Sequence, residues 1–240
     1  MRAVRKGGGH FRLRNRQLSY LHDMTVGGAS SPNIAWHNFQ YKSDTRGACL
    51  LEQFHLCAFS EVVLDDNDLG MHLDHVRPKS KFPDKTFDHT NLLLSAFGSD
   101  QLKGIAKSDV FGGHYRGNRY SSVGFISPLR VDCRTYFHYA SNGEIQPALE
   151  LTQAGARKAR YSIAILNLNA PLLVARRRRW LEELEQAIDL LLAAPQALDF
   201  FAEAELCDTQ GILRPFHSAV RQRFGVRGES IIRNNGAACG

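Results

Sequence analysis

The chain lacks any long apolar run, and this shortage excludes whole classes of protein. No stretch approaches the ~20 consecutive apolar residues that a helix needs to cross a bilayer. The first residues are basic and lead into three glycines, where a secretion signal would have an apolar stretch. The five cysteines are odd in number and widely spaced, which argues against a disulfide framework and suits a reducing compartment. We therefore expect a soluble, cytoplasmic protein.

A modest excess of positive charge is the main feature of the composition. The 240 residues include 30 Lys or Arg and 24 Asp or Glu, so the formal net charge is +6. This balance favours a polyanionic partner such as nucleic acid. The hydrophobic content of 43% is enough for a buried core in one large domain or two small ones. Composition alone identifies no reaction.

Four polar residues in the first half of the chain have a spacing that indicates chemistry: Asp74, His75, Asn91 and Asp100. Cleavage of a phosphodiester needs a water nucleophile, a base that deprotonates it, and a cation that balances the charge on the phosphate oxygens. Asp74 and Asp100 are carboxylates of the kind that hold Mg²⁺. His75 has an imidazole that is largely neutral near pH 7 and can accept a proton.

The local pattern around these residues predicts a strand, a loop, a second strand and a helix. A β-prone run from Val62 to His75 ends before Pro78, which interrupts regular pairing. The apolar residues Leu92 to Leu94 follow a polar loop and form a plausible returning strand. Ser99 can then cap a helix that carries Asp100 in its first turn.

This pattern resembles the HNH endonuclease superfamily, which has a ββα-metal fold. The resemblance implies that Asp74 binds one divalent cation, Mg²⁺ or Mn²⁺, and that His75 is the general base. It also implies that Asn91 holds the loop that positions His75, and that Asp100 is the second metal ligand. Asn or His is commoner at the position of Asp100. Because a carboxylate is still a hard oxygen ligand, we expect activity to survive with an altered metal preference.

A second resemblance covers most of the chain. It is to the HNH nuclease subunit of Septu anti-phage systems, the PtuB-like proteins, which also accompany some retrons. It implies an ABC-type ATPase as partner and, in a retron, a reverse transcriptase with its DNA–RNA product. Its motifs are the N-terminal run from Met1 to Lys6, the turn from Cys57 to Ser60, the segments Leu73 to Lys79 and Asn91 to Ser95, and the pair Lys103-Gly104.

These relatives often carry two Cys-x-x-Cys pairs that bind a structural zinc. Here the corresponding positions are Cys57 with Ser60 and Ala96 with Ser99. Tetrahedral structural zinc needs four nitrogen or sulfur ligands, and only one remains. We therefore expect no structural zinc. Packing around two aromatic residues would brace the hairpin instead: Phe59 and Phe97.

Basic residues next to the motif are candidates for phosphate contact: Arg77, Lys79 and Lys103. Residues 115 to 120 interleave Tyr and Arg, as a strand-binding loop would, although ordinary loop chemistry explains them nearly as well. A run of four arginines is a candidate for docking to nucleic acid or a partner: Arg176, Arg177, Arg178 and Arg179. Consecutive helical residues cannot all face one duplex, so a solvated, salt-bridged helix face is an equal alternative.

The chain as a whole predicts an α+β fold, with an HNH core embedded in a mainly helical chain and one additional hairpin. Asn142-Gly143 gives the hairpin signal after Tyr139. Helices are expected from Thr152, after Asn169 with Pro171 in the first turn, and from about Pro215 to Phe224, where Gly225 ends the last one. The expected regions are a basic arm over 1–30 that orders on a partner or frays, a nuclease module over 31–110 with a helix capped by Asp44, a hairpin and helical region over 111–228, and a disordered tail over 229–240.

Two functions from different classes are open at this stage. The first is a metal-dependent endonuclease that acts on DNA or RNA, including tRNA. The second is a catalytically impaired subunit that uses the same fold to bind nucleic acid or to scaffold an ATPase assembly. Cleavage that EDTA and the loss of His75 both abolish would separate them.

Overall fold

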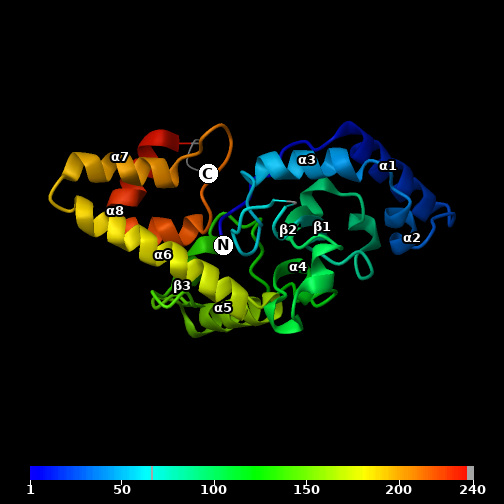
Figure 1. The fold of residues 1–240 in the computed structure, drawn as a ribbon. Helices are drawn as coiled ribbons and strands as arrows, with labels where there is room; N and C mark the ends of the chain where they lie inside the picture. The colour runs from blue at the N-terminus through cyan, green and yellow to red at the C-terminus, as the bar shows by residue number, and fades with distance from the viewer. Residues whose placement is uncertain (66, 237–240) are drawn as a thin grey trace.

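The computed structural model describes residues 1–65 and 67–236 and has an α+β fold in which helices dominate. The helices are α1 (Phe11–Thr25), α2 (Pro32–His37), α3 (Lys42–Glu52), α4 (Gly112–Arg116), α5 (Gln153–Leu166), α6 (Pro171–Leu191), α7 (Pro195–Leu206) and α8 (His217–Asn235). The strands are β1 (Met71–His75), β2 (Leu92–Ala96), β3 (Phe137–Tyr139) and β4 (Ile145–Pro147). Helices α1 to α3 lie at one end of an elongated molecule and α6 to α8 at the other, with the N-terminus near the centre (Figure 1).

The pair β1–β2 is antiparallel, and its second strand is the centre of the first half of the molecule. All five residues of β2 are buried, because α3 packs on it from one side and α4 from another. The free edge of β2 is satisfied by a side chain: Gln53, at the end of α3, accepts from Leu94 N at 2.7 Å and donates to Leu94 O at 3.0 Å. The strand therefore has no unpaired polar edge there.

Several predicted elements are confirmed. The second hairpin pairs β3 with β4, and Gly143 in its turn has a φ of +86°, a conformation that favours glycine. Thr152 caps α5 by accepting from Gly155 N at 3.2 Å. Pro171 begins α6, as its fixed φ allows. The residue before that helix is Ala170, and Asn169 does not cap it.

The prediction of an α-helix directly after β2 is wrong. Residues Gln101–Gly104 form a single 3-10 turn, η3, and neither Ser99 nor Asp100 caps it with a side chain. The segment is held differently, because Gln101 lies against Gly70 and Gly98, where no Cβ is in the way. The helix after β2 that packs on this strand is α4, in the stretch where we expected a loop. The strand before the motif is also shorter than expected and begins only at Met71.

The N-terminal 30 residues are part of the fold and not a peripheral arm. Met1 is 1% exposed, and Val4 N donates to Pro128 O at 2.7 Å, so the first residues run through the middle of the molecule. Residues 11–25 form α1, with Leu13 and Tyr20 buried. Asp44 lies in the first turn of α3 and does not cap it, because the helix begins after Tyr41.

The C-terminal part of the chain is more helical than the sequence suggested. Helix α7 was not predicted, and α8 continues through Gly225, whose φ of +53° marks a kink, to Asn235. The residues from 229 to 235 are therefore helical, whereas the remainder of the expected tail, 237–240, lies outside the described residues. The nuclease module was predicted to end at residue 110. That boundary would separate α4 from β2, although the two are in contact.

Two further expectations concern membranes and thiols. None of the helices in the described ranges combines the length and the apolarity needed to span a bilayer. Cys49, Cys57 and Cys133 are buried free thiols. Cys207 is disulfide-bonded, and one such residue does not make the disulfide framework that the sequence argued against. Cys239 lies outside the described residues.

A buried ion pair joins the two halves of the molecule. The amino group of Met1 lies 2.9 Å from Glu61 Oε1, and both groups are nearly inaccessible. Ser218 donates to Glu61 from its backbone N and its Oγ, each at 2.6 Å. Burial alone would raise the pKa of Glu61, but the Met1 charge and the Ser218 hydrogen bonds lower it to about 2. Glu61 thus stays ionised throughout the physiological range.

We expect Glu61→Gln to lower the free energy of unfolding by about 3–5 kcal/mol, because it leaves a buried ammonium without a counter-charge. Glu183→Gln is the matched control: it removes an exposed carboxylate that pairs with Arg179, and should cost less than about 1 kcal/mol. Urea unfolding at pH 7 measures both. The stability that Glu61 contributes should disappear as the pH falls from 4.5 towards 2, because its folded pKa is depressed. Equal unfolding midpoints for the two variants would contradict this account.

Candidate functional site

The end of β1 carries two of the predicted residues, one on each face. Asp74 pairs with Leu93 and His75 with Leu92, so the strand ends at His75 and Val76 N still donates to Asn91 O at 2.9 Å. Adjacent strand residues point to opposite faces, and Asp74 therefore faces α4 while His75 faces the side of α2. The two side chains lie on either side of the same strand end.

His75 is held in one orientation by its surroundings. Its Nε2 lies 2.9 Å from Thr86 O, and since a carbonyl can only accept, Nε2 carries the proton and Nδ1 has the free lone pair. The ring of Trp36 stands edge-on to the imidazole, with centroids 4.6 Å apart. Burial, together with the charge of Lys79, lowers the pKa of His75 to about 4. The imidazole is therefore neutral at pH 7.

Asn91 closes the loop between the two strands. Its Oδ1 accepts from Arg77 N at 2.8 Å, and its Nδ2 donates to Arg77 O and to Lys85 O, each at 3.0 Å. The side chain is buried, so these three bonds satisfy the amide. Thr86, which orients His75, directly follows Lys85. Asn91 thus positions the carbonyl that holds the imidazole.

Asp74 is paired with a buried guanidinium from α4. Arg116 Nη2 lies 2.7 Å from Asp74 Oδ2 and also donates to His75 O at 2.7 Å, while Nη1 donates to Val76 O at 3.0 Å. Arg116 is only 1% exposed. The interpretation of residues 115 to 120 as a strand-binding loop is therefore wrong for Arg116, which fixes the end of β1 instead.

Two further histidines approach Asp74 on its own face. His72 lies two residues earlier on β1, and the ring of His114, from α4, has its centroid 3.8 Å from that of His72. Desolvation lowers the pKa of both imidazoles, for His114 to about 4. The Nε2 of His114 is buried and has no hydrogen-bond partner. Sequence reasoning missed both residues in this role, although the spacing of His72 and Asp74 on one strand face is a signal that the sequence contains.

Asp100 is not brought to Asp74. Its side chain is 89% exposed and pairs with Lys103 at 3.0 Å, itself 79% exposed, whereas that of Asp74 is 13% exposed. Gly98 N bonds to Leu69 O, which places the segment before Asp100 at the start of β1 rather than at its end. The two carboxylates therefore do not form one metal site in this conformation.

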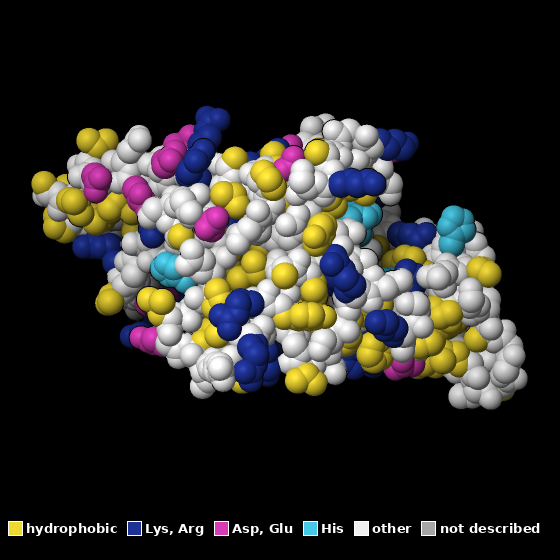
Figure 2. All heavy atoms as spheres, turned by 90° about the horizontal axis from the view of Figure 1, so that it is seen from below, with side chains coloured by type: hydrophobic (Ala, Val, Ile, Leu, Met, Phe, Trp, Pro, Cys, Tyr) yellow, Lys and Arg dark blue, Asp and Glu magenta, His cyan; other side chains and the backbone are white. Residues whose placement is uncertain are grey.

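The basic residues near the motif divide between two environments. Lys79 is partly buried, and although burial lowers its pKa, the carboxylate of Asp74 opposes that effect. Arg77 is exposed and lines a cleft of about 640 Å³ beside Asn91, together with Arg5 and Lys6. Within the described part of the chain, neither Arg5 nor Arg77 has an acidic partner. On the face that Figure 2 shows, Lys and Arg side chains are spread among apolar and neutral ones. The cleft suits a phosphate chain.

The four consecutive arginines are all engaged within the molecule. Arg176 forms an ion pair with Asp68, and Arg177, with no exposed side-chain surface, donates to Gly143 O and Leu168 O. The other two pair along the helix one turn ahead, Arg178 with Glu182 at 3.8 Å and Arg179 with Glu183 at 2.9 Å. These contacts favour the salt-bridged helix face over docking.

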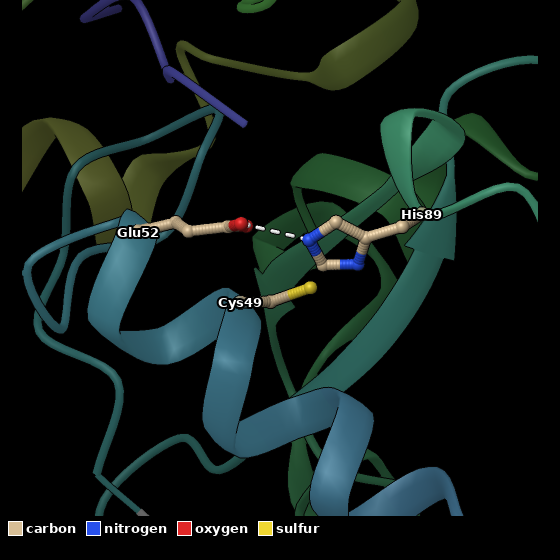
Figure 3. Close-up of side chains that lie close together, drawn as sticks. All are labelled: Cys49, Glu52 and His89. Carbon is tan, nitrogen blue, oxygen red and sulfur yellow. Dashed lines mark hydrogen bonds and ion pairs between the residues drawn. The ribbon is translucent and has the colours of Figure 1, made fainter. Parts of the chain in front are cut away.

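A separate cluster of possible ligands joins α3 to the loop before β2. Cys49, Glu52 and His89 bring their ligand atoms within 4.8 Å of one another (Figure 3). The ammonium of Lys6 lies among them: it bonds Glu52, donates to Leu92 O at 3.0 Å and stands 3.5 Å from Cys49 Sγ. Burial raises the pKa of the Cys49 thiol to about 11. A metal ion does not fit here, because Lys6 already supplies the positive charge and the thiol keeps its proton.

Four positions correspond to the zinc ligands of the family that the sequence resembles, and only some of them lie close together. Cys57 Sγ lies 3.3 Å from Ala96 N and accepts a hydrogen bond from it. Ser60 is buried and Ser99 is exposed. The rings of Phe97 and Phe111 are 4.7 Å apart, and that of Phe59 is 6.5 Å from Phe125, so aromatic packing occupies this region.

Neither a known family model nor a curated protein matches the chain.

We expect Asn91→Ala to loosen the loop between β1 and β2 locally. The Arg77 amide should exchange its hydrogen roughly tenfold faster, because it loses one side-chain acceptor. Asn169→Ala is the matched control, since Asn169 makes the same kind of paired bond to Ile145 in β4. Its effect should be confined to Ile145. Unchanged exchange at Arg77 in the Asn91 variant would show that another contact holds the loop.

Proposed function

We propose that the protein is a metal-dependent endonuclease of the HNH type that hydrolyses phosphodiester bonds in nucleic acid. The observation that carries the proposal is the state of His75. It is a neutral imidazole, fixed through Nε2 by Thr86 so that the Nδ1 lone pair is free, and it stands one residue from a carboxylate. Such a lone pair can take a proton from an attacking water at pH 7.

The proposed roles of the other residues follow from their contacts. Asn91 positions Thr86, and Arg77 and Arg5 bind substrate phosphates in the cleft of about 640 Å³. Asp74 holds one divalent cation, Mg²⁺ or Mn²⁺, which would offset negative charge on the phosphate oxygens. Asp100 and Lys103 join the site only if η3 moves towards Asp74. Lys79 contributes through its charge near Asp74 and His75.

The setting of the activity is a proposal drawn from the resemblance to the Septu nuclease subunit. We propose a cytoplasmic effector that works with an ABC-type ATPase and, where a retron is present, with a reverse transcriptase and its DNA–RNA product. DNA is the favoured substrate, because HNH enzymes mostly cut DNA. RNA, including tRNA, is the second choice, since cleavage at a phosphate does not depend on the sugar.

A specific observation favours a second function, that of an impaired HNH-fold subunit that binds nucleic acid or scaffolds the ATPase. Arg116 compensates Asp74, and Asp100 is exposed to solvent, so the two carboxylates expected at the metal are apart. In that case the basic cleft would bind nucleic acid without cutting it.

Cleavage of supercoiled DNA and of total tRNA, with the ATPase present, tests the proposal. Wild type should cut with Mg²⁺ or Mn²⁺ and stop in EDTA. His75→Ala should cut at least about 100-fold more slowly, because the general base is lost, yet bind DNA unchanged. Arg77→Ala combined with Arg5→Ala should weaken binding instead and reduce its salt dependence.

The pH dependence gives an independent check. Because the pKa of His75 is about 4, cutting should not titrate with this residue between pH 6 and 8 and should fall only as the pH approaches 4. Equal cutting by wild type and His75→Ala would overturn the assigned mechanism. Binding without cutting by wild type, at every metal and pH, would establish the scaffold function in its place.

A further inference from the structure

We propose that His72, Asp74 and His114 form a binding site for a first-row transition-metal dication, with two imidazole nitrogens and one carboxylate oxygen as ligands. His72 and Asp74 are two residues apart on β1 and therefore project from the same face. Helix α4 covers that face and brings His114 onto the ring of His72. The set shares Asp74 with the proposed nuclease but replaces the exposed Asp100 with nitrogen ligands.

The hydrogen bonds of His72 prepare it as a ligand. Its Nδ1 lies 2.9 Å from Phe97 O, so this nitrogen carries the proton and Nε2 has the lone pair. A metal-bound imidazole commonly donates its other N–H to a backbone carbonyl in this way. Phe97 has a φ of +73°, a rare conformation for a large side chain, and strain of this kind gathers at functional sites.

His114 supplies the second nitrogen. Its Nε2 is buried and has no hydrogen-bond partner among the described residues. A buried ring nitrogen without a partner is unfavourable unless something binds there. An imidazole nitrogen of this kind is a common ligand of first-row transition metals.

The space between the ligands is kept open by Gly113. A Cβ at this residue would lie 2.9 Å from His72 Nε2, 2.7 Å from Asp74 Cγ and 3.0 Å from Asp74 Oδ1. The two ligand atoms therefore flank one small volume that a side chain would fill. Arg116 binds the other carboxylate oxygen, Oδ2, and leaves Oδ1 for the ion.

Closure of the site requires side-chain rotation. Among residues 1–65 and 67–236, only Cys49, Glu52 and His89 already have three ligand atoms within 4.8 Å of one another, and there Lys6 occupies the position of a cation. At His72 and Asp74 the neighbouring cation is Arg116, which binds Asp74 Oδ2 and leaves Oδ1 available. A ligand set of two nitrogens and one oxygen favours the first-row transition-metal ions, from Mn²⁺ through Zn²⁺. Mg²⁺ is disfavoured, because it prefers oxygen ligands and octahedral geometry.

The metal's part in cleavage rests on the proposed nuclease function, whereas the binding site itself does not. Metal binding is therefore measured directly, by titrating the purified full-length protein with Co²⁺ and following its visible absorption, and with Zn²⁺ by calorimetry. We expect one ion per chain, competition between Zn²⁺ and Co²⁺, and no displacement by millimolar Mg²⁺.

Five variants locate the ion. His72→Gln and His114→Gln should each weaken binding by roughly 100-fold or more, since each removes a ligand. Gly113→Ala, which removes no ligand, should weaken binding by filling the space. Cys49→Ser and Glu183→Gln are controls and should bind as wild type does. Thermal unfolding without metal checks that each variant is folded.

The outcomes separate this inference from the nuclease proposal. Binding lost in Cys49→Ser but kept in His114→Gln would overturn the inference and place the ion at the other cluster. No binding of Zn²⁺ or Co²⁺ by wild type would also overturn it, even if Mg²⁺ supported cleavage. Tight binding that depends on His72 and His114, without any cleavage, would uphold the metal site and reject the nuclease.

Discussion

The buried guanidinium of Arg116 is the contact on which the candidate site depends. It binds the carboxylate of Asp74 and two successive backbone carbonyls at the end of β1, from a helix only five residues long. Loss of either partner would leave a buried charge unpaired at a cost of about 3–5 kcal/mol, so the strand end and α4 stabilise each other. Both sets of candidate metal ligands contain Asp74, and its orientation is fixed by this contact.

The opposite face of the same strand end is organised by neutral groups. Asn91 closes the loop, Thr86 offers its carbonyl to His75, and Trp36 stands against the ring. Burial here lowers the pKa of the imidazole to about 4 and keeps it uncharged at pH 7, while the carboxylate one residue away is paired with Arg116. Alternation along a strand thus gives two adjacent residues opposite electrostatic environments, which is a useful arrangement for a base beside a cation site.

The sequence predicted these features unequally, for physical reasons. Turn and cap signals are local, so the Asn142-Gly143 hairpin, the Thr152 cap and the Pro171 helix start were predictable. Arg116 and His114 act through contacts across about 40 residues, and their own neighbours in the sequence suggest only a loop.

The errors have the same origin. Ser99 and Asp100 have good capping chemistry, but Gln101 packs against Gly70 and Gly98 and leaves only a 3-10 turn.

The central claim is that His75 is a neutral base with a free Nδ1. Nitrogen-15 NMR of the histidine side chains over pH 3 to 8 tests it most directly. The account predicts that His75 carries its proton on Nε2 at pH 7 and titrates near pH 4. A proton on Nδ1, or a pKa at or above 6.5, would contradict it.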